Sequence, residues 1–256
     1  MSEFVTFHDL KDTSVFITGG GAGIGASLTE GFIEQGAKVA FVQRSDATAF
    51  CDEMAEKHGS KPLFMPCDIT DIGALTAAMT QAEEAHGPIT RLVNNAANDT
   101  RHKTLDYSVE DWDRGQAINL RPHFFTAQAA APGMKAAGYG AIVNFSSISY
   151  MMGNAGYPGY VAAKAGITGL TRGLARELGA DGIRVNALMP GWVLTQRQMD
   201  LWATPEDLAA HLDRQCLKEH LAPRDILDAT LFLSSEASRM MTGQALVVDG
   251  GVVVSG

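Results

Sequence analysis

The chain has 256 residues, of which 46% are hydrophobic and 19% are charged. This composition is typical of a globular protein and excludes disordered and fibrous classes. Lys and Arg total 20 against 29 Asp and Glu, so the net charge is −9. An acidic chain lacks the basic face of a nucleic-acid-binding protein and does not favour an anionic membrane surface. We therefore expect neither partner.

Targeting and cysteine patterns add two further exclusions. No apolar run approaches the roughly 20 residues that span a bilayer, and the first residues do not resemble a signal peptide. We therefore expect a cytoplasmic protein. Cys51, Cys67 and Cys216 are far apart and odd in number, which argues against a disulfide framework, and no metal-ligand spacing occurs.

Short β-rich runs alternate with longer helical patterns along the chain. Strands are predicted at residues 14–18, 38–42, 62–65, 91–94, 141–145, 183–188 and 245–248. Helices are predicted at residues 23–35, 46–58, 71–86, 109–137 and 159–179, with small helices after the sixth strand. This alternation predicts right-handed βαβ units. The expected fold is a Rossmann-like, doubly wound α/β domain over residues 1–256, with a seven-stranded parallel sheet and helices on both faces.

A glycine-rich turn lies between the first predicted strand and the first predicted helix. Thr18 to Gly25 is TGGGAGIG. Glycines let the backbone approach a pyrophosphate, and the N-terminus of the following helix favours its negative charge. The turn therefore predicts a nucleotide site that includes Gly19, Gly23, Ile24 and Gly25.

The spacing T-G-x-x-x-G-x-G resembles the short-chain dehydrogenase/reductase family, and the resemblance extends over essentially the whole chain. Asp68 ends the third strand, Asn94-Asn95-Ala96-Ala97 matches N-N-A-G except at Ala97, and Pro190-Gly191 precedes Thr195. The missing glycine at residue 97 suggests slight strain or a slight shift there. The resemblance implies cofactor contacts from Asp68, Ile69, Asn95, Ala96, Pro190, Gly191, Val193 and Thr195.

The end of the second strand bears on the choice of cofactor. An acidic residue there binds the adenosine ribose and repels a 2′-phosphate, but this chain has Gln43 followed by Arg44. Gln43 can still bind a ribose hydroxyl. Arg44 is either a phosphate ligand or a solvated surface residue, and the nearby Asp46 would weaken phosphate binding. We expect NADP to be tolerated or preferred, with NAD use possible.

Four residues form the predicted catalytic set. Tyr160 and Lys164 are four residues apart, so they share one face of a helix, and Ser147 follows the fifth strand. Asn119 completes the family resemblance to an Asn-Ser-Tyr-Lys tetrad. Oxidation of an alcohol requires removal of its hydroxyl proton, for which a tyrosine is a poor base unless its pKa is lowered.

Each member of this set has an expected role. The Lys164 ammonium should lower the pKa of Tyr160, and Lys164 should also hold the cofactor ribose, so both residues belong to the cofactor site as well. Ser147 should hold the substrate oxygen. Asn119 should anchor a water that leads protons from Lys164 to solvent.

Candidate substrate residues are Asn98, Asn154 and Arg197, together with Ser147 and Tyr160. A substrate loop is expected at about residues 191–222. Three stretches resemble bacterial sugar dehydrogenases of the xylose type: 98–103, 195–198 and 215–218. The resemblance implies that an aldose, a pentose or a 6-deoxyhexose, is oxidised at C1 to a lactone.

Several alternatives remain open. One is a dehydrogenase of a polyol or of a 2-keto-3-deoxy sugar acid; Arg101 and Arg197 would then bind the carboxylate of the sugar acid. The others are a 3-oxoacyl reductase and a redox-sensing binding module. The family resemblance implies a homotetramer, and a dimer is the alternative.

Overall fold

A single parallel sheet forms the centre of the protein. The structure is a computed structural model that describes residues 5–254. The strands are β1 (Ser14–Thr18), β2 (Lys38–Gln43), β3 (Leu63–Pro66), β4 (Arg91–Asn94), β5 (Gly140–Phe145), β6 (Ile183–Pro190) and β7 (Ala245–Val248). All neighbouring strands are parallel in the order β3-β2-β1-β4-β5-β6-β7. The predicted seven-stranded, doubly wound fold is confirmed.

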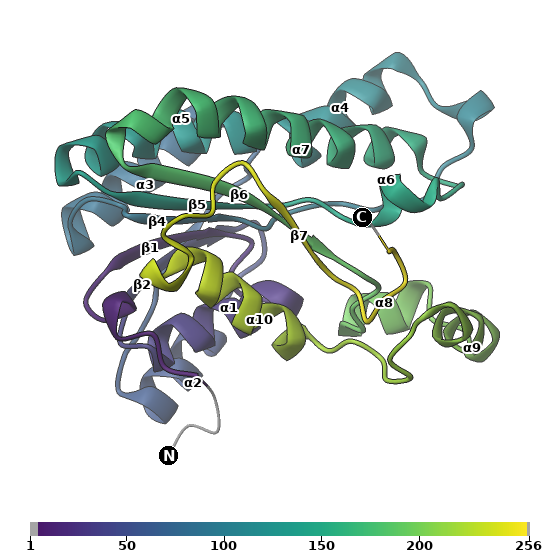
Figure 1. The fold of residues 1–256 in the computed structure, drawn as a ribbon, viewed down its shortest axis with the longest axis horizontal. Helices are drawn as coiled ribbons and strands as arrows, with labels where there is room; N and C mark the ends of the chain where they lie inside the picture. The colour runs from purple at the N-terminus through teal and green to yellow at the C-terminus, as the bar shows by residue number, and fades with distance from the viewer. Residues whose placement is uncertain (1–4, 255–256) are drawn as a thin grey trace.

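Helices cover both faces of this sheet, as Figure 1 shows. The helices are α1 (Gly23–Glu34), α2 (Thr48–His58), α3 (Ile72–His86), α4 (Val109–Asn119), α5 (Arg121–Ala137), α6 (Ser149–Met152), α7 (Pro158–Leu178), α8 (Gln196–Leu201), α9 (Pro205–Arg214) and α10 (Pro223–Ser234). Helices α1, α2 and α10 pack on one face, and α3, α5 and α7 pack on the other. Helices α8 and α9 extend to one side, near the carboxyl ends of the strands.

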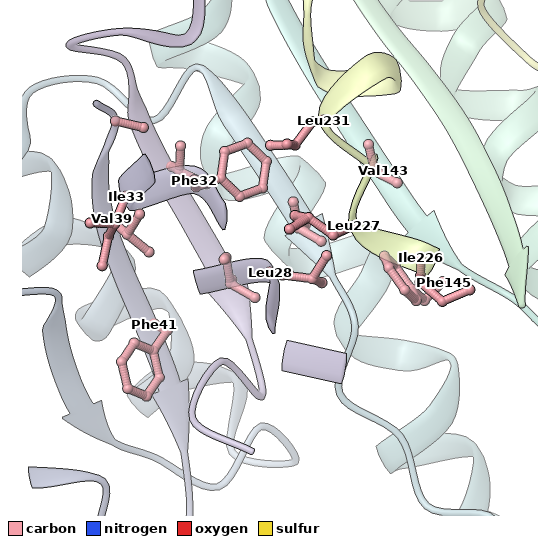
Figure 2. Close-up of a cluster of buried hydrophobic side chains, with 14 of the residues drawn as sticks. Leu28, Phe32, Ile33, Val39, Phe41, Val143, Phe145, Ile226, Leu227 and Leu231 are labelled. Atoms are coloured by element: carbon pink, nitrogen blue, oxygen red, sulfur yellow. The ribbon is translucent and has the colours of Figure 1, made fainter. Parts of the chain in front are cut away.

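The apolar core is divided by the sheet into two clusters. On the α1 face, Phe32 of α1 and Leu227 of α10 are fully buried against strand residues such as Phe41 and Val143 (Figure 2). Residues buried on both sides of a sheet account for the continuous apolar runs in the strands. Truncating one such aromatic side chain to alanine costs about 3–5 kcal/mol. This packing holds the strand ends, and the loops that leave them, in fixed positions.

One predicted helix is wrong in extent. The sequence predicts a continuous helix over residues 109–137, but the chain breaks at Leu120, which has φ −126° and ψ −52°. Pro122 at the start of α5 explains the break, because proline has no N–H to donate to the Ile118 carbonyl oxygen and its ring would clash with that carbonyl in a continuous helix. The break places Asn119 at the end of α4, where its side chain can reach the site.

Smaller differences concern boundaries and single residues. Strand β6 runs to Pro190, two residues beyond its predicted end, and α6 is a short helix that the pattern does not predict. Ala97 does not adopt left-handed backbone geometry, since Asp12 is the one non-glycine residue within 5–254 that has a positive φ; the slight strain or shift suggested there stays a prediction. No helix in that range is long and apolar enough to cross a membrane.

Candidate active site

A large cavity lies beyond the carboxyl ends of the strands. Its volume is about 960 Å³, and loops after β1, β2, β3, β4, β5 and β6 line it. The sheet order reverses between β1 and β4, which is the point where open parallel sheets bind ligands. The cavity spans from the glycine-rich turn to α8 and α9, so it brings the predicted cofactor and substrate residues to one site.

The glycine-rich turn leaves β1 in a conformation that requires glycine. Gly19 has φ +73° and Gly23 has φ +55°, both in the left-handed region. A Cβ atom on Gly25 would overlap the carbonyl oxygen of Gly19. Helix α1 begins at Gly23, so its first N–H groups face the cavity end where a phosphate would lie.

Asn95 connects this turn to the end of β4. Its side-chain Nδ2 donates to the carbonyl oxygens of Thr18 at 3.2 Å and Gly19 at 3.1 Å. The Thr18 hydroxyl in turn accepts from the backbone N–H groups of Asn95 and Ala96, at 3.0 and 3.1 Å. These bonds hold the floor of the cavity rigid, because each one crosses between two neighbouring strands.

The ends of β2 and β3 form the far wall of the cavity. Gln43 Oε1 accepts from Gly21 N–H at 2.9 Å, so this side chain braces the glycine-rich turn. Arg44 has an exposed side chain whose guanidinium lies 4.0 Å from the Asp68 carboxylate. Backbone and hydroxyl hydrogen bonds from Thr70 lower the pKa of Asp68. Arg44, Asp68 and Ile69 all line the cavity.

The segment after β6 closes the cavity from the other side. Gly191 N–H donates to Val248 of β7, and a Cβ atom at residue 191 would come within 2.8 Å of Asp249. Val193 is buried, and the Thr195 hydroxyl caps α8 by accepting from Gln198 N–H at 3.3 Å. Pro190, Gly191, Val193 and Thr195 all line the cavity.

This cradle fits a dinucleotide. Glycine backbone borders the position where the phosphates would lie, and the N-terminus of helix α1 points at that position. Gly23 and Thr195 approach each other so closely that a Cβ atom at residue 23 would be 3.2 Å from the Thr195 side chain. Asp68 and Arg44 lie at the end where an adenosine would be held. Small residues and close backbone approach are what a bound pyrophosphate requires.

The predicted catalytic side chains come from β5 and α7. Tyr160 and Lys164 lie one turn apart on α7, and the Lys164 Nζ atom is 5.3 Å from the centre of the Tyr160 ring. Ser147 follows β5, and its hydroxyl accepts from Ser149 N–H at 3.1 Å. All three line the cavity. The structure thus brings together a phenol, a hydroxyl and an amine at one end of the nucleotide cradle.

Burial controls the acidity of these groups. Lys164 is only 1% exposed, its Nζ donates to the Phe145 carbonyl oxygen at 2.7 Å, and burial lowers its pKa to about 7. Burial raises the pKa of Tyr160 above its ordinary value, the Asp99 charge raises it further, and the Ser147 hydroxyl lowers it. Burial is the largest influence on the Tyr160 pKa and acts against the expected lowering, so the lowering by Lys164 and a bound nicotinamide stays a prediction.

Asn119 is hydrogen-bonded to the loop that follows β4. Its Oδ1 accepts from Asn98 N–H at 2.8 Å, and its Nδ2 donates to the Asn98 carbonyl oxygen at 3.0 Å. It is buried, and a third bond goes to Gly115. The side chain therefore fixes the loop after β4 by pairing with both polar groups of one residue. Its expected water-anchoring role stays a prediction.

The three predicted substrate residues reach the cavity from three different elements. Asn154 follows α6 and donates to the Tyr157 hydroxyl at 3.1 Å. Asn98 accepts through Oδ1 from the Thr100 hydroxyl at 2.7 Å and from Arg197 at 3.3 Å. Arg197, on α8, also lies 3.5 Å from Asp99. All three line the cavity.

Asp99 and His211 line the cavity but are absent from the predicted site, and Arg101 was predicted only under the sugar-acid alternative. Asp99 lies next to Asn98, and Arg101 stacks on the Tyr157 ring at 3.9 Å and lies 5.2 Å from the Trp202 ring. His211 of α9 packs edge-on against Trp192. The sequence signals on this side of the cavity were the polar run 98–103 and the stretch 195–198, and α9 carries no motif.

Known proteins resemble this chain over nearly its whole length. The family described as Enoyl-(Acyl carrier protein) reductase matches residues 19–253, which contain every predicted site residue. The chain belongs to the short-chain dehydrogenase/reductase family. It is therefore an oxidoreductase, and family members use NAD or NADP.

Two similar curated relatives act on sugars by name. The chain is 46% identical over 248 residues to "Probable galactose dehydrogenase GalD" of Rhizobium meliloti (strain 1021), covering 96% of this chain and 97% of the relative. It is 44% identical over 247 residues to a D-xylose 1-dehydrogenase of Caulobacter vibrioides (strain NA1000 / CB15N), with coverage of 96% and 97%.

A solved structure supports the fold independently. An inferred gluconate dehydrogenase of Agrobacterium tumefaciens superposes with a TM-score of 0.91 at 30% identity. The match covers 97% of this chain and 98% of that one.

Proposed function

We propose that the protein oxidises an aldose at C1 to the lactone, with NAD or NADP as the oxidant. The observation that carries this proposal is the high identity, over nearly the whole chain, to relatives named for galactose and D-xylose oxidation. The cavity supports it with polar side chains beside the predicted catalytic set, which suit a polyhydroxylated ligand: Asn98, Asp99 and Asn154.

The proposed chemistry assigns one task to each residue at the centre. Tyr160 takes the proton of the C1 hydroxyl, and Ser147 donates a hydrogen bond to the same oxygen and holds it in place. A nicotinamide nucleotide held in the cradle would supply the hydride-accepting chemistry that oxidation at C1 requires. With a pKa of about 7, Lys164 can hold or release a proton near neutral pH, so it can stabilise the Tyr160 phenolate in its charged form.

The remaining cofactor residues are proposed to bind the nucleotide along the cradle. Gly19, Gly23, Ile24 and Gly25 would face the pyrophosphate, and Asp68 and Ile69 the adenine. Asn95, Ala96, Pro190, Gly191, Val193 and Thr195 would surround the nicotinamide end. Gln43 presents no negative charge to a 2′-phosphate, and Arg44 presents a positive one at the cavity wall. These two residues support NADP as a tolerated or preferred cofactor.

The sugar-acid alternative receives less support from the contacts of Arg197. Its guanidinium is already engaged by Asp99 and by Asn98. A carboxylate ligand at this position would have to displace the Asp99 carboxylate from Arg197. The polyol alternative keeps the same site and differs only in the hydroxyl that is oxidised. A homotetramer and a cytoplasmic location also remain proposals; the three cysteines are free thiols, as expected in a reducing compartment.

A substrate panel tests the proposed function directly. D-xylose, D-galactose, galactitol and D-gluconate are each offered with NAD and with NADP, and formation of the reduced nucleotide is followed by absorbance. We expect the highest kcat/KM with a free aldose, and a lactone as the product identified by mass spectrometry. Oxidation of galactitol or gluconate without oxidation of any aldose would contradict the proposal.

A further inference from the structure

Asp99 is a charged side chain on the side of the cavity that is formed by residues 98–101 and helices α8 and α9. Contacts with other side chains hold it in place. One carboxylate oxygen accepts from Gln198 Nε2 at 2.7 Å, and the other lies 3.5 Å from the Arg197 guanidinium. Gln198 is itself held, because its Oε1 accepts from Trp192 Nε1 at 2.9 Å. The carboxylate is thus fixed between the loop after β4 and helix α8, and its side chain is 20% exposed.

The Asp99 charge acts on the reaction centre. It raises the pKa of both Tyr160 and Lys164, and its influence on Tyr160 exceeds the opposite influence of Arg101. The Arg101 guanidinium lies instead over the Tyr157 ring at 3.9 Å. A ligand bound beside Tyr160 therefore lies within reach of the Asp99 charge.

The carboxylate also has capacity for further hydrogen bonds. An ionised carboxylate offers about four acceptor positions. The bond from Gln198 and the contact with Arg197 use one position on each oxygen. Asp99 lines the cavity, so a hydroxyl group of a bound ligand can reach a remaining position. Hydrogen bonds to an ionised acceptor are stronger than those between neutral groups.

We propose that Asp99 is a specificity-determining residue, which accepts a hydrogen bond from a sugar hydroxyl and disfavours sugars that carry a carboxylate. A neutral aldose satisfies the fixed carboxylate, whereas an anionic sugar brings a like charge into the same cavity. Selection of this kind combines attraction for one ligand with repulsion of its competitor. The inference rests on the proposed function, since it concerns the sugar bound at that site.

The matched ligands for a test are D-galactose and D-galacturonate, which share the C1 hydroxyl and differ in charge at C6. Affinity for each is measured by calorimetry on the complex with reduced nucleotide, in which an aldose is not oxidised. In the wild-type protein we expect galactose to bind at least about tenfold more tightly than galacturonate. In Asp99→Asn, which keeps the shape and can still accept from Gln198, this ratio should fall by about tenfold or more.

The control variant is Asp200→Asn. Asp200 is an exposed carboxylate on the same helix α8, bonded to Gln196 and outside the cavity lining. The Asp200→Asn substitution changes the net charge by the same amount as Asp99→Asn and should leave the ratio of galactose to galacturonate affinity unchanged. Asp99→Ala serves as a second variant, and thermal unfolding verifies that each variant is folded.

Two results overturn the inference. One is a ratio of galactose to galacturonate affinity in Asp99→Asn and Asp99→Ala that stays within about twofold of the wild-type ratio. The other is a change of this ratio in Asp200→Asn that equals the change in Asp99→Asn. Failure of the proposed function is separate, because it appears as absent aldose oxidation by the wild-type protein. The binding ratio still decides the role of Asp99 in that case.

Discussion

The two walls of the cavity are built in different ways. The catalytic wall, defined here as Ser147, Tyr160 and Lys164, is carried by β5 and the long helix α7, and Lys164 is almost fully buried. The substrate wall, defined as residues 98–101 and helices α8 and α9, is held by side-chain contacts such as Gln198 to Asp99. Its Arg197 is half exposed.

This difference separates chemistry from specificity. Buried hydrogen bonds support the strand ends behind the catalytic wall: Asn94 donates to Asn144 at 2.9 Å, and Asn144 donates to Thr171 of α7 at 3.1 Å. Surface ion pairs contribute only about 0–1 kcal/mol each, so the substrate wall can rearrange at small cost. We therefore expect single changes on the catalytic wall to abolish activity and those on the substrate wall to adjust it.

The largest effect is expected for Tyr160→Phe. Removing the phenolic hydroxyl removes the proposed proton acceptor, so kcat should fall by about 10³-fold. Steady-state rates with saturating sugar and nucleotide measure it. Tyr157→Phe is the matched control, because that ring lies 5.3 Å from Tyr160, and it should retain kcat within about tenfold. A wild-type rate in Tyr160→Phe would overturn the catalytic assignment.

The second-largest effect is expected for Gly25→Ala, which should disrupt the nucleotide cradle. The added methyl group overlaps the Gly19 carbonyl oxygen, so the turn must move and nucleotide affinity should fall about 100-fold. Fluorescence titration with the reduced nucleotide measures the change. Gly169→Ala, on α7 with no atom near the added Cβ, should leave affinity intact and stabilise the protein by about 0.5–1 kcal/mol. Equal affinities in both variants would exclude this cradle.

The pH dependence of stability tests the role of His123, a buried side chain whose pKa is affected by Lys164 of the catalytic wall. Burial and the Lys164 charge lower its pKa from 6.5 to about 3. The unfolded chain then binds a proton that the folded protein does not, so His123 reduces the free energy of unfolding as the pH falls below about 6.5. Between pH 7 and pH 5, the free energy of unfolding should fall by about 1–2 kcal/mol less in His123→Leu than in the wild type. Urea unfolding at the two pH values measures this difference.

The control for this pH effect is His8→Asn, since His8 is exposed. It should follow the wild-type curve across the same range. Parallel curves for His123→Leu and the wild type would show that His123 does not contribute to acid sensitivity.

Arg44→Gln addresses the cofactor end of the site. If the guanidinium pairs with a 2′-phosphate, the ratio of kcat/KM with NADP to that with NAD should fall about tenfold. Arg114→Gln, a change in an exposed ion pair on α4, should leave the ratio unchanged. An unchanged ratio in Arg44→Gln would identify Arg44 as a solvated surface residue.

The smallest effect is expected on the substrate wall. Gln198→Ala removes the hydrogen bonds to Asp99 and Trp192, so the sugar KM should rise about three- to tenfold with little change in kcat. Asp200→Ala on the same helix removes only an exposed bond from Gln196, lies outside the cavity lining and serves as the control. A large fall in kcat for Gln198→Ala would show that the two walls are not independent.

Most of the fold and one part of the site could be predicted from local patterns. Buried strands, their alternation with helices, the glycine-rich turn and the Tyr160 to Lys164 spacing all depend on residues close together in the chain. The helix break at Leu120 required the effect of Pro122, a local signal that the apolar pattern hid. The direction of the Tyr160 pKa could not be predicted, because it depends on burial by distant residues.

Sequence patterning by itself determined the architecture, since hydrophobic periodicity and glycine placement act over a few residues. Only the tertiary structure decided how the substrate wall is assembled. Asp99 meets Gln198 across 99 positions of the chain, and Asn119 pairs with Asn98 across 21. Such contacts have no local signature, because they form only after the sheet has packed and has brought the loops together at the ends of its strands.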